Sequence, residues 1–251
     1  MQEKIRIITT RNGRLVCAPR EVLFQRLVDL MDHAGNDGRA YSIGLTGGST
    51  PKAFYDWTVR EDALPAGVRE RAVWTVSDER MVPLASDESN FGTADRRLLT
   101  PVKIAEGHKL PWPVQVDPHS AATVFNRRWT ERFGGETCFD LCVLGMGDDG
   151  HTASIFPGSP LLEVDLAENF TCVEVPEKGW RLTITRAGLE RSRKVAVIVT
   201  GAAKAKVLKQ VMEGPEGHYP VQILQAFRER VTWLVDPEAA AGLSSLNAVR
   251  G

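Results

Sequence analysis

The amino-acid sequence predicts an α/β fold, with a mostly parallel, doubly wound sheet and helices on both of its faces. Strand-like and helix-like patterns alternate along the chain. In addition, some apolar runs are continuous, such as those over residues 141–144 and 195–199. Strands covered on both faces have such runs, as in a parallel sheet between two layers of helices. Ligands of these folds bind beyond the carboxyl ends of the strands, so we expect functional residues in the loops that follow strands.

The expected elements begin with a small hairpin, whose strands are Lys4–Thr9 and Arg14–Ala18. Asn12-Gly13 between them is a dipeptide that favours tight turns. Apolar residues spaced by three and four then predict a helix over Pro19–Ala34. The further elements are strands at Tyr41–Leu45, Val73–Ser77, Phe139–Gly145, Arg181–Thr185, Val195–Thr200 and Val231–Val235, and helices at Ala121–Phe133 and Ala202–Met212. No repeat or linker-like run divides the sequence, so we expect one domain over residues 1–251.

Composition and charge exclude several classes of protein. The chain has 251 residues, 43% of them hydrophobic, and its 31 basic residues nearly balance 32 acidic ones. A net charge of −1 gives no electrostatic reason to expect binding to nucleic acid or to an anionic membrane. No apolar run has the length of a membrane helix, and the N-terminal residues lack the apolar core of a signal peptide. We therefore expect a cytoplasmic protein that binds a small molecule and keeps its four cysteines reduced.

The first candidate binding loop, residues 44–51, reads GLTGGSTP and follows a predicted strand. Gly47 and Gly48 allow the backbone to approach a ligand, and we expect Ser49 or Thr50 to cap the next helix. The backbone N–H groups at the start of that helix would suit a phosphate. The order of a Walker A motif is absent, so nothing here predicts a nucleoside triphosphate, and a plain strand-to-helix turn is the alternative.

A second loop places charged residues after the next strand. Asp78, Glu79 and Arg80 put two carboxylates and a guanidinium at the sheet edge, where arginine suits bidentate contacts to oxyanions. A solvated charge cluster is the simpler interpretation. Ser89 is expected to cap the following helix, with Asn90 pointing back to the same edge.

The third loop, residues 145–157, reads GMGDDGHTASIFP. Its first six residues match the G-x-G-x-x-G pattern of dinucleotide-binding loops. We reject that interpretation, because Asp148 and Asp149 would direct negative charge at a pyrophosphate and Pro157 would interrupt the long helix that the pattern needs. An acidic side chain two positions before His151 can instead hold the imidazole as a general base.

Late in the chain, RLTIT contains Arg181 and VTGAAK contains Lys204. Lys204 is expected in the first turn of a helix, where the helix dipole disfavours a cation. An anionic ligand shared with the loop over 44–51 would explain this lysine, although a solvent-facing side chain is an equal alternative.

Taken together and in this order, GLTGGSTP, SDERMVP followed by SN, GMGDDGHTASIFPGSP, RLTIT and VTGAAK resemble the 6-phosphogluconolactonase family. That family belongs to the group that includes glucosamine-6-phosphate deaminase. The resemblance implies a Rossmann-like sheet in a single catalytic domain. It also implies hydrolysis of 6-phospho-D-glucono-1,5-lactone to 6-phospho-D-gluconate in the oxidative pentose phosphate pathway, without an organic cofactor or a required metal. A monomer and a dimer are both left open.

Two positions separate the lactonase pattern from that of the deaminase. The deaminase pattern reads D-G-H-I-A-F-N-E-P and D-E-Y, whereas this chain has Phe156 in place of the glutamate and Arg80 in place of the tyrosine. Both differences favour the lactonase. The alternatives are a deaminase or other sugar-phosphate isomerase, and a non-catalytic sugar-phosphate-binding module, which would not need both Asp149 and His151.

A δ-lactone is reactive enough to be attacked by water directly, so no nucleophilic serine or cysteine is expected. We expect His151 to take the proton of that water and Asp149 to fix the ring tautomer. Arg80 is the third expected catalytic residue, stabilising either the oxyanion or the phosphate. The residues expected to bind substrate are Gly47, Gly48, Ser49, Asp78, Asn90, Arg181 and Lys204. No metal ligands are expected.

Overall fold

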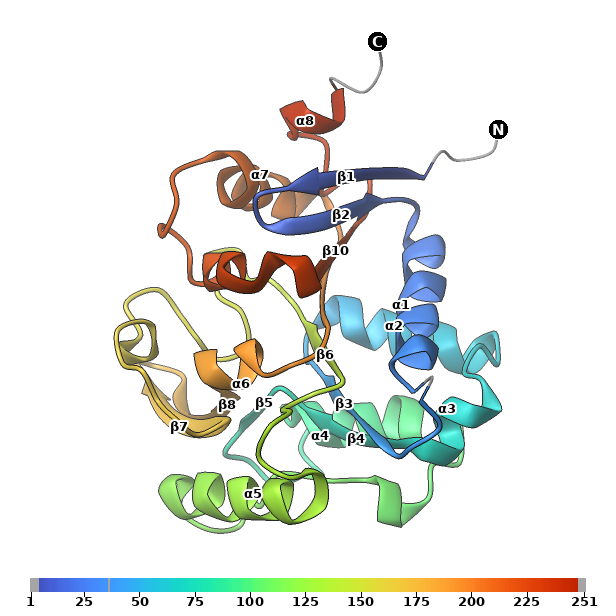
Figure 1. Cartoon of the computed structure of the whole chain (residues 1–251), viewed down its shortest axis with the longest axis vertical. Coiled ribbons are helices and arrows are strands. Elements are labelled where there is room, and N and C mark those ends of the chain that lie inside the picture. Colours follow the sequence, from blue (N-terminus) through green and yellow to red (C-terminus); the bar gives the residue numbers. More distant parts are fainter. Residues whose placement is uncertain (1–4, 36, 248–251) are drawn as a thin grey trace.

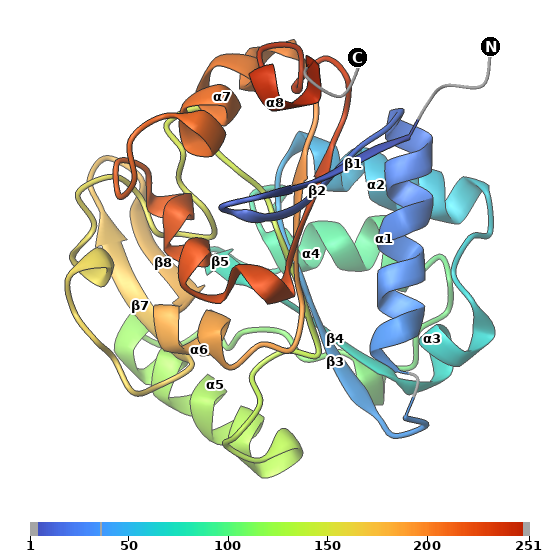
Figure 2. The same cartoon turned by 45° about the horizontal axis from the view of Figure 1, so that its top comes forward.

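The computed structural model describes residues 5–35 and 37–247, and its centre is a seven-stranded sheet with strand order β1-β2-β10-β9-β6-β3-β4 (Figure 1). Neighbouring strands pair in parallel except β1, which pairs with β2 in the antiparallel direction. Helices α1 and α2 lie on one side of this sheet, and α6 and α7 lie on the other (Figure 2). The predicted fold class, including the N-terminal hairpin, is therefore confirmed.

The strands of the central sheet follow the predicted pattern closely, and β3 and β10 have the predicted bounds. The hairpin turn consists of Arg11 and Asn12, one residue earlier than expected, because Gly13 already pairs with Thr10. The bounds are β1 Arg6–Thr10, β2 Gly13–Cys17, β3 Tyr41–Leu45, β4 Ala72–Val76, β6 Leu141–Leu144, β9 Val195–Val199 and β10 Val231–Val235. Lys4, where the first strand was expected to begin, lies outside the described residues.

A second, smaller sheet is antiparallel and has the order β5-β8-β7. Its strands are β5 Asp78–Arg80, β7 Phe170–Val175 and β8 Gly179–Ile184. The strand predicted at Arg181–Thr185 is therefore part of this sheet. Since β5 follows β4 after a single residue, the small sheet begins at the carboxyl edge of the central sheet.

The α-helices have the bounds α1 Arg20–Ala34, α2 Ser49–Arg60, α3 Ala66–Arg71, α4 Asn90–Ala94, α5 Pro118–Phe133, α6 Arg186–Glu190, α7 Ala205–Glu213 and α8 Ser244–Asn247. A π-helical turn, Asp95–Leu99, extends α4, and 3₁₀ turns occupy Glu106–His108, Pro160–Leu162, Ala202–Lys204 and Pro220–Arg230. The helix expected from Ala202 thus begins as a 3₁₀ turn and continues as α7. Of the helices in the described ranges, none is both long and apolar enough to cross a membrane.

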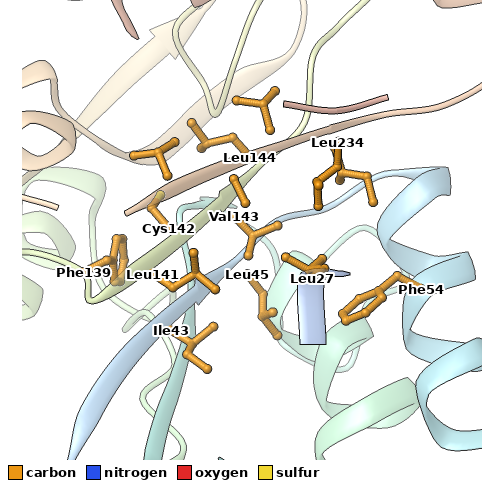
Figure 3. Packing of buried hydrophobic residues seen from close by; sticks show 14 of the residues in the cluster. Leu27, Ile43, Leu45, Phe54, Phe139, Leu141, Cys142, Val143, Leu144 and Leu234 are labelled. Atoms are coloured by element: carbon orange, nitrogen blue, oxygen red, sulfur yellow. The ribbon is translucent and has the colours of Figure 1, made fainter. Parts of the chain in front are cut away.

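One hydrophobic core lies on both faces of the central sheet. Side chains from β3, β6 and β10 meet side chains from α1 and α2 there, including Leu27, Ile43, Phe54 and Leu234 (Figure 3). Burying one such side chain contributes roughly 1.5–3 kcal/mol relative to exposure. The continuous apolar runs therefore make the sheet rigid, and its loops can hold functional groups in fixed positions.

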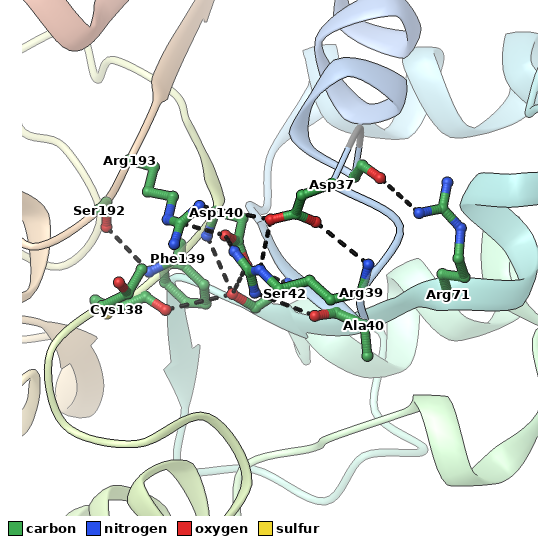
Figure 4. A network of polar contacts seen from close by, with 12 residues as sticks. Asp37, Arg39, Ala40, Ser42, Arg71, Cys138, Phe139, Asp140, Ser192 and Arg193 are labelled. Carbon is green, nitrogen blue, oxygen red and sulfur yellow. Dashed lines mark hydrogen bonds and ion pairs between the residues drawn. The ribbon is translucent and has the colours of Figure 1, made fainter.

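Asp140 ties the amino ends of β3 and β6 together (Figure 4). Its carboxylate is 2% exposed and accepts hydrogen bonds from the backbone N–H of Ser42 at 2.8 Å and from the Ser42 hydroxyl at 3.2 Å. The guanidinium groups of Arg39 and Arg193 contact the same carboxylate from the surface. The buried charge of Asp140 is thus paired at the amino edge of the sheet, opposite to the loops that carry the candidate functional residues.

We expect Asp140→Ala to lower the free energy of unfolding by roughly 1–3 kcal/mol, because the buried N–H of Ser42 loses its acceptor. Urea unfolding at neutral pH measures the change. Asp37→Asn is the control, since exposed Asp37 bonds Arg39 without holding a buried group, and its effect is expected to be much smaller. Equal effects of the two substitutions would contradict the assignment.

Candidate active site

A cleft of about 250 Å³ lies at the carboxyl ends of β3, β6 and β9. The loops that follow these strands form its walls, together with side chains from β5 and the start of α4. Most of the residues predicted from the sequence line it, namely Gly47, Gly48, Ser49, Asp78, Arg80, Asn90, His151 and Lys204. Asp149 and Arg181 do not line it.

The first wall of the cleft is the amino end of α2. The expectation that Ser49 or Thr50 caps this helix is wrong: the cap is Gly48, with a φ of 111° and no side-chain hydrogen bond. The hydroxyl of Thr50 lies instead 2.7 Å from that of Thr200, in the loop after β9. The backbone N–H groups of Gly48, Ser49 and Thr50 have no acceptor within the described part of the chain. They can therefore bind an anion in the cleft.

Position 47 requires a glycine because the side chain of Asn90 lies against its backbone, and not because of an unusual φ angle. A Cβ at this position would lie 2.0 Å from Oδ1 of Asn90. The side chain of Asn90 is in turn fixed by donating to the carbonyl of Asp78 at 2.9 Å. The glycine loop therefore packs directly against the start of α4, which Ser89 caps as expected by accepting from the N–H of Gly92.

Hydrogen bonds and a stacked aromatic ring fix the position of His151. Its Nδ1 lies 2.5 Å from Oδ1 of Asp149, and its backbone N–H donates to the same oxygen at 3.0 Å. The ring of Phe156 stacks on the imidazole, with centroids 4.2 Å apart and planes at 25°. A Cβ at position 147 would lie 2.0 Å from the imidazole, so Gly147 leaves room for it. The bond predicted between Asp149 and His151 is present.

The loop of His151 is followed by turns and not by a long helix, which agrees with the rejection of a dinucleotide-binding loop. Burial raises the pKa of Asp149, but the hydrogen bonds from the backbone and ring of His151 outweigh it, and the pKa lies below its usual value. Asp149 is therefore ionised at neutral pH, when it can orient the ring and stabilise an imidazolium.

The alternation of β5 separates its two carboxylates. Asp78 faces the cleft and accepts a hydrogen bond from the hydroxyl of Ser154 at 2.9 Å. Burial raises the pKa of Asp78, and this hydrogen bond offsets part of the rise. Glu79 points the other way, so the interpretation that both carboxylates face a ligand is wrong for this residue.

Glu79 supports the wall of the cleft from behind. Its fully buried carboxylate accepts hydrogen bonds from the N–H groups of Arg80, Asn90 and Phe91, each at 2.8 Å, and from the hydroxyl of Ser89 at 2.9 Å. Burial raises the pKa of Glu79, and these donors oppose that rise. The carboxylate thus joins β5 to the start of α4.

Arg80 is anchored through one nitrogen, because its Nη1 donates to the carbonyl of Glu88 at 2.5 Å and to Oδ1 of Asn90 at 3.2 Å. Its Nε and Nη2 have no acceptor among the described residues. Arg181 lies opposite Arg80 in the β5–β8 pair, outside the cleft lining. Burial and the neighbouring Arg80 lower the pKa of Arg181. Two adjacent guanidinium groups favour an anion nearby.

Lys204 lines the cleft from the turn before α7, and its side chain is 26% exposed. It is not simply solvent-facing, because its Nζ lies 2.6 Å from Oδ1 of Asp148. The sequence reasoning missed this pair, the contact of Thr50 with Thr200 and the stacking of Phe156. None of these contacts has a local sequence signal.

Comparisons with known proteins identify the family of this chain. A family model described as glucosamine-6-phosphate isomerases/6-phosphogluconolactonase matches residues 20–233. A 6-phosphogluconolactonase of Rattus norvegicus is 34% identical over 233 residues, covering 90% of this chain and 88% of that protein. One of Homo sapiens is 34% identical over 214 residues, covering 81% and 80%. The solved structure of the 6-phosphogluconolactonase of Trypanosoma brucei matches with a TM-score of 0.75 and 29% identity, covering 91% of this chain and 97% of that one. With a family model that matches most of its length, the chain belongs to the glucosamine-6-phosphate isomerase/6-phosphogluconolactonase family.

Proposed function

We propose that this protein hydrolyses 6-phospho-D-glucono-1,5-lactone to 6-phospho-D-gluconate. The observation that carries the proposal is one cleft that contains a carboxylate-held histidine, a helix start without a side-chain cap, and a lysine. The first is a base for activating water, and the second is a site for a phosphate dianion. The relatives named 6-phosphogluconolactonase support the same reaction.

In the proposed reaction, the unprotonated ring nitrogen of His151 takes a proton from water as the water oxygen bonds to the lactone carbonyl carbon. The tetrahedral intermediate then collapses, the bond from that carbon to the ring oxygen breaks, and the imidazolium returns its proton to the departing oxygen. Asp149 stabilises the imidazolium between these steps. Phe156 keeps the ring plane fixed by stacking on one face. Positioning of this kind lowers the barrier because little reorganisation is needed.

The phosphate group is assigned to the N–H groups at the start of α2, with Lys204 beside them. Arg80 is assigned to the same group, because its Nη1 and the backbone of Gly47 both adjoin Oδ1 of Asn90. The two free nitrogens of Arg80 would then face the glycine loop, and Arg181 would add positive potential from the neighbouring strand β8. Asp78 and Asn90 are assigned to the sugar hydroxyls.

The main competing activity is that of a deaminase, whose pattern needs a carboxylate where this chain has Phe156. The aromatic ring fills the space beside His151, so a second acid or base is missing there. We therefore expect the purified protein to hydrolyse freshly generated lactone faster than its spontaneous loss and to release no ammonia from glucosamine 6-phosphate. Ammonia release without lactone hydrolysis would refute the proposal. Binding of sugar phosphates with neither activity would favour the non-catalytic binding module.

We expect His151→Ala to lower kcat by roughly 10²–10⁴-fold, the usual contribution of a general base. Binding of 6-phosphogluconate, measured by calorimetry, is expected to change little, since the phosphate-binding groups remain. The control is His33→Ala, which alters an exposed histidine near the end of α1. Normal turnover in the His151 variant would remove this residue from the mechanism.

We expect Lys204→Met to raise KM by about 10- to 100-fold, because a hydrogen bond to a charged group is lost, while kcat changes little. Lys206→Met is the matched control, since Lys206 is an exposed lysine at the start of α7. An unchanged KM, or equal effects of the two substitutions, would place the phosphate elsewhere.

A further inference from the structure

We propose that Asp148 competes with the substrate's phosphate group for Lys204, so that the ion pair between these residues is a latch that a phosphorylated ligand opens. The inference rests on the proposed function, because it takes Lys204 as a phosphate-binding residue. It assigns Asp148 a part in setting the affinity for substrate and product.

The latch joins two loops that sheet pairing brings together. Asp148 lies in the loop after β6 and Lys204 in the turn after β9, and these strands are neighbours that pair Leu144 with Val197. The Nζ of Lys204 lies 2.6 Å from the Asp148 carboxylate. Lys204 lines the cleft, whereas the Asp148 side chain is 78% exposed at its rim. The lysine thus shares the cleft with the start of α2, while its ammonium group is paired with a carboxylate at the rim.

The two adjacent aspartates of this loop are held very differently. Asp149 receives hydrogen bonds from both the backbone and the ring of His151. For Asp148, the ammonium of Lys204 is the one side-chain partner within residues 5–35 and 37–247. Asp148 can therefore turn out to solvent when Lys204 leaves it, without disturbing the base.

Electrostatics make the pair a weak competitor. A phosphate dianion at the amino end of α2 would attract Lys204 and repel Asp148, because like charges only a few ångströms apart are unfavourable. An exposed ion pair shifts an equilibrium by only about 2- to 5-fold, so the dianion with its additional N–H donors prevails. The product bears the same phosphate group, and Asp148 would help to displace it after hydrolysis.

The test compares the affinities of Asp148→Asn and of the wild-type protein for inorganic phosphate and 6-phosphogluconate, by phosphorus NMR titration at low ionic strength. We expect the variant to bind both anions about 2- to 5-fold more tightly. The matched control is Glu106→Gln, because Glu106 also lies 2.6 Å from a lysine ammonium, that of Lys109, which bridges to Trp74 of β4 outside the cleft lining. The control removes the same charge, and we expect it to leave both affinities unchanged.

A double-mutant cycle with Lys204→Met separates the latch from simple charge repulsion. If Asp148 acts by occupying Lys204, Asp148→Asn tightens binding in the wild-type background and has no effect when Lys204 is absent. Unchanged affinity in the single variant, or equal tightening in both backgrounds, would overturn the latch. Because inorganic phosphate reports on Lys204 without any reaction, a protein without lactonase activity would refute the proposed function while the phosphate titration still tests the latch.

Discussion

The active-site geometry depends on the pairing of β6 with β3 on one side and with β9 on the other. Parallel pairing aligns the carboxyl ends of these strands, as when Gly44 pairs with Cys142 and Leu144 with Val197. Three loops from distant parts of the chain therefore leave the sheet side by side. One loop leads to a helix start without a side-chain cap, one carries the histidine and one carries the lysine. Burial of the strands on both faces makes the alignment rigid, because a shift in register would disrupt the core.

Close approach of the loops explains the positions of two glycines. Gly47 leaves space for Asn90, and Gly147 leaves space for the imidazole of His151. The wall that β5 and the start of α4 form depends on the buried carboxylate of Glu79. Its burial is unfavourable alone, yet donors from β5 and the start of α4 satisfy both oxygens. The Glu79 carboxylate thus does not face the cleft, yet it fixes the backbone of Arg80 and Asn90, which we propose bind the substrate.

Charge acts in this protein through its placement. The chain as a whole is nearly neutral, but Arg80, Arg181 and Lys204 are on or beside one cleft. Their charge is opposed by two carboxylates, with Asp78 in the cleft lining and the exposed Asp148 paired with Lys204. A balanced site of this kind can bind a dianion and still release it, since binding replaces existing interactions.

The sequence by itself determined the alternation of strands and helices, the glycine loops and the bond between Asp149 and His151, because each depends on residues close together in the chain. Tertiary structure alone decided the features that depend on distant partners. Thr50 contacts Thr200, so that Gly48 is the N-cap of α2. Glu79 turns away from the cleft toward α4, and Arg181 lies beside Arg80 on the neighbouring strand, outside the cleft lining. Lys204 likewise finds its carboxylate only where β9 lies beside β6. Local patterns specify which groups a loop carries, whereas the directions of these groups follow from hydrogen bonds and ion pairs that form only when the sheet is assembled.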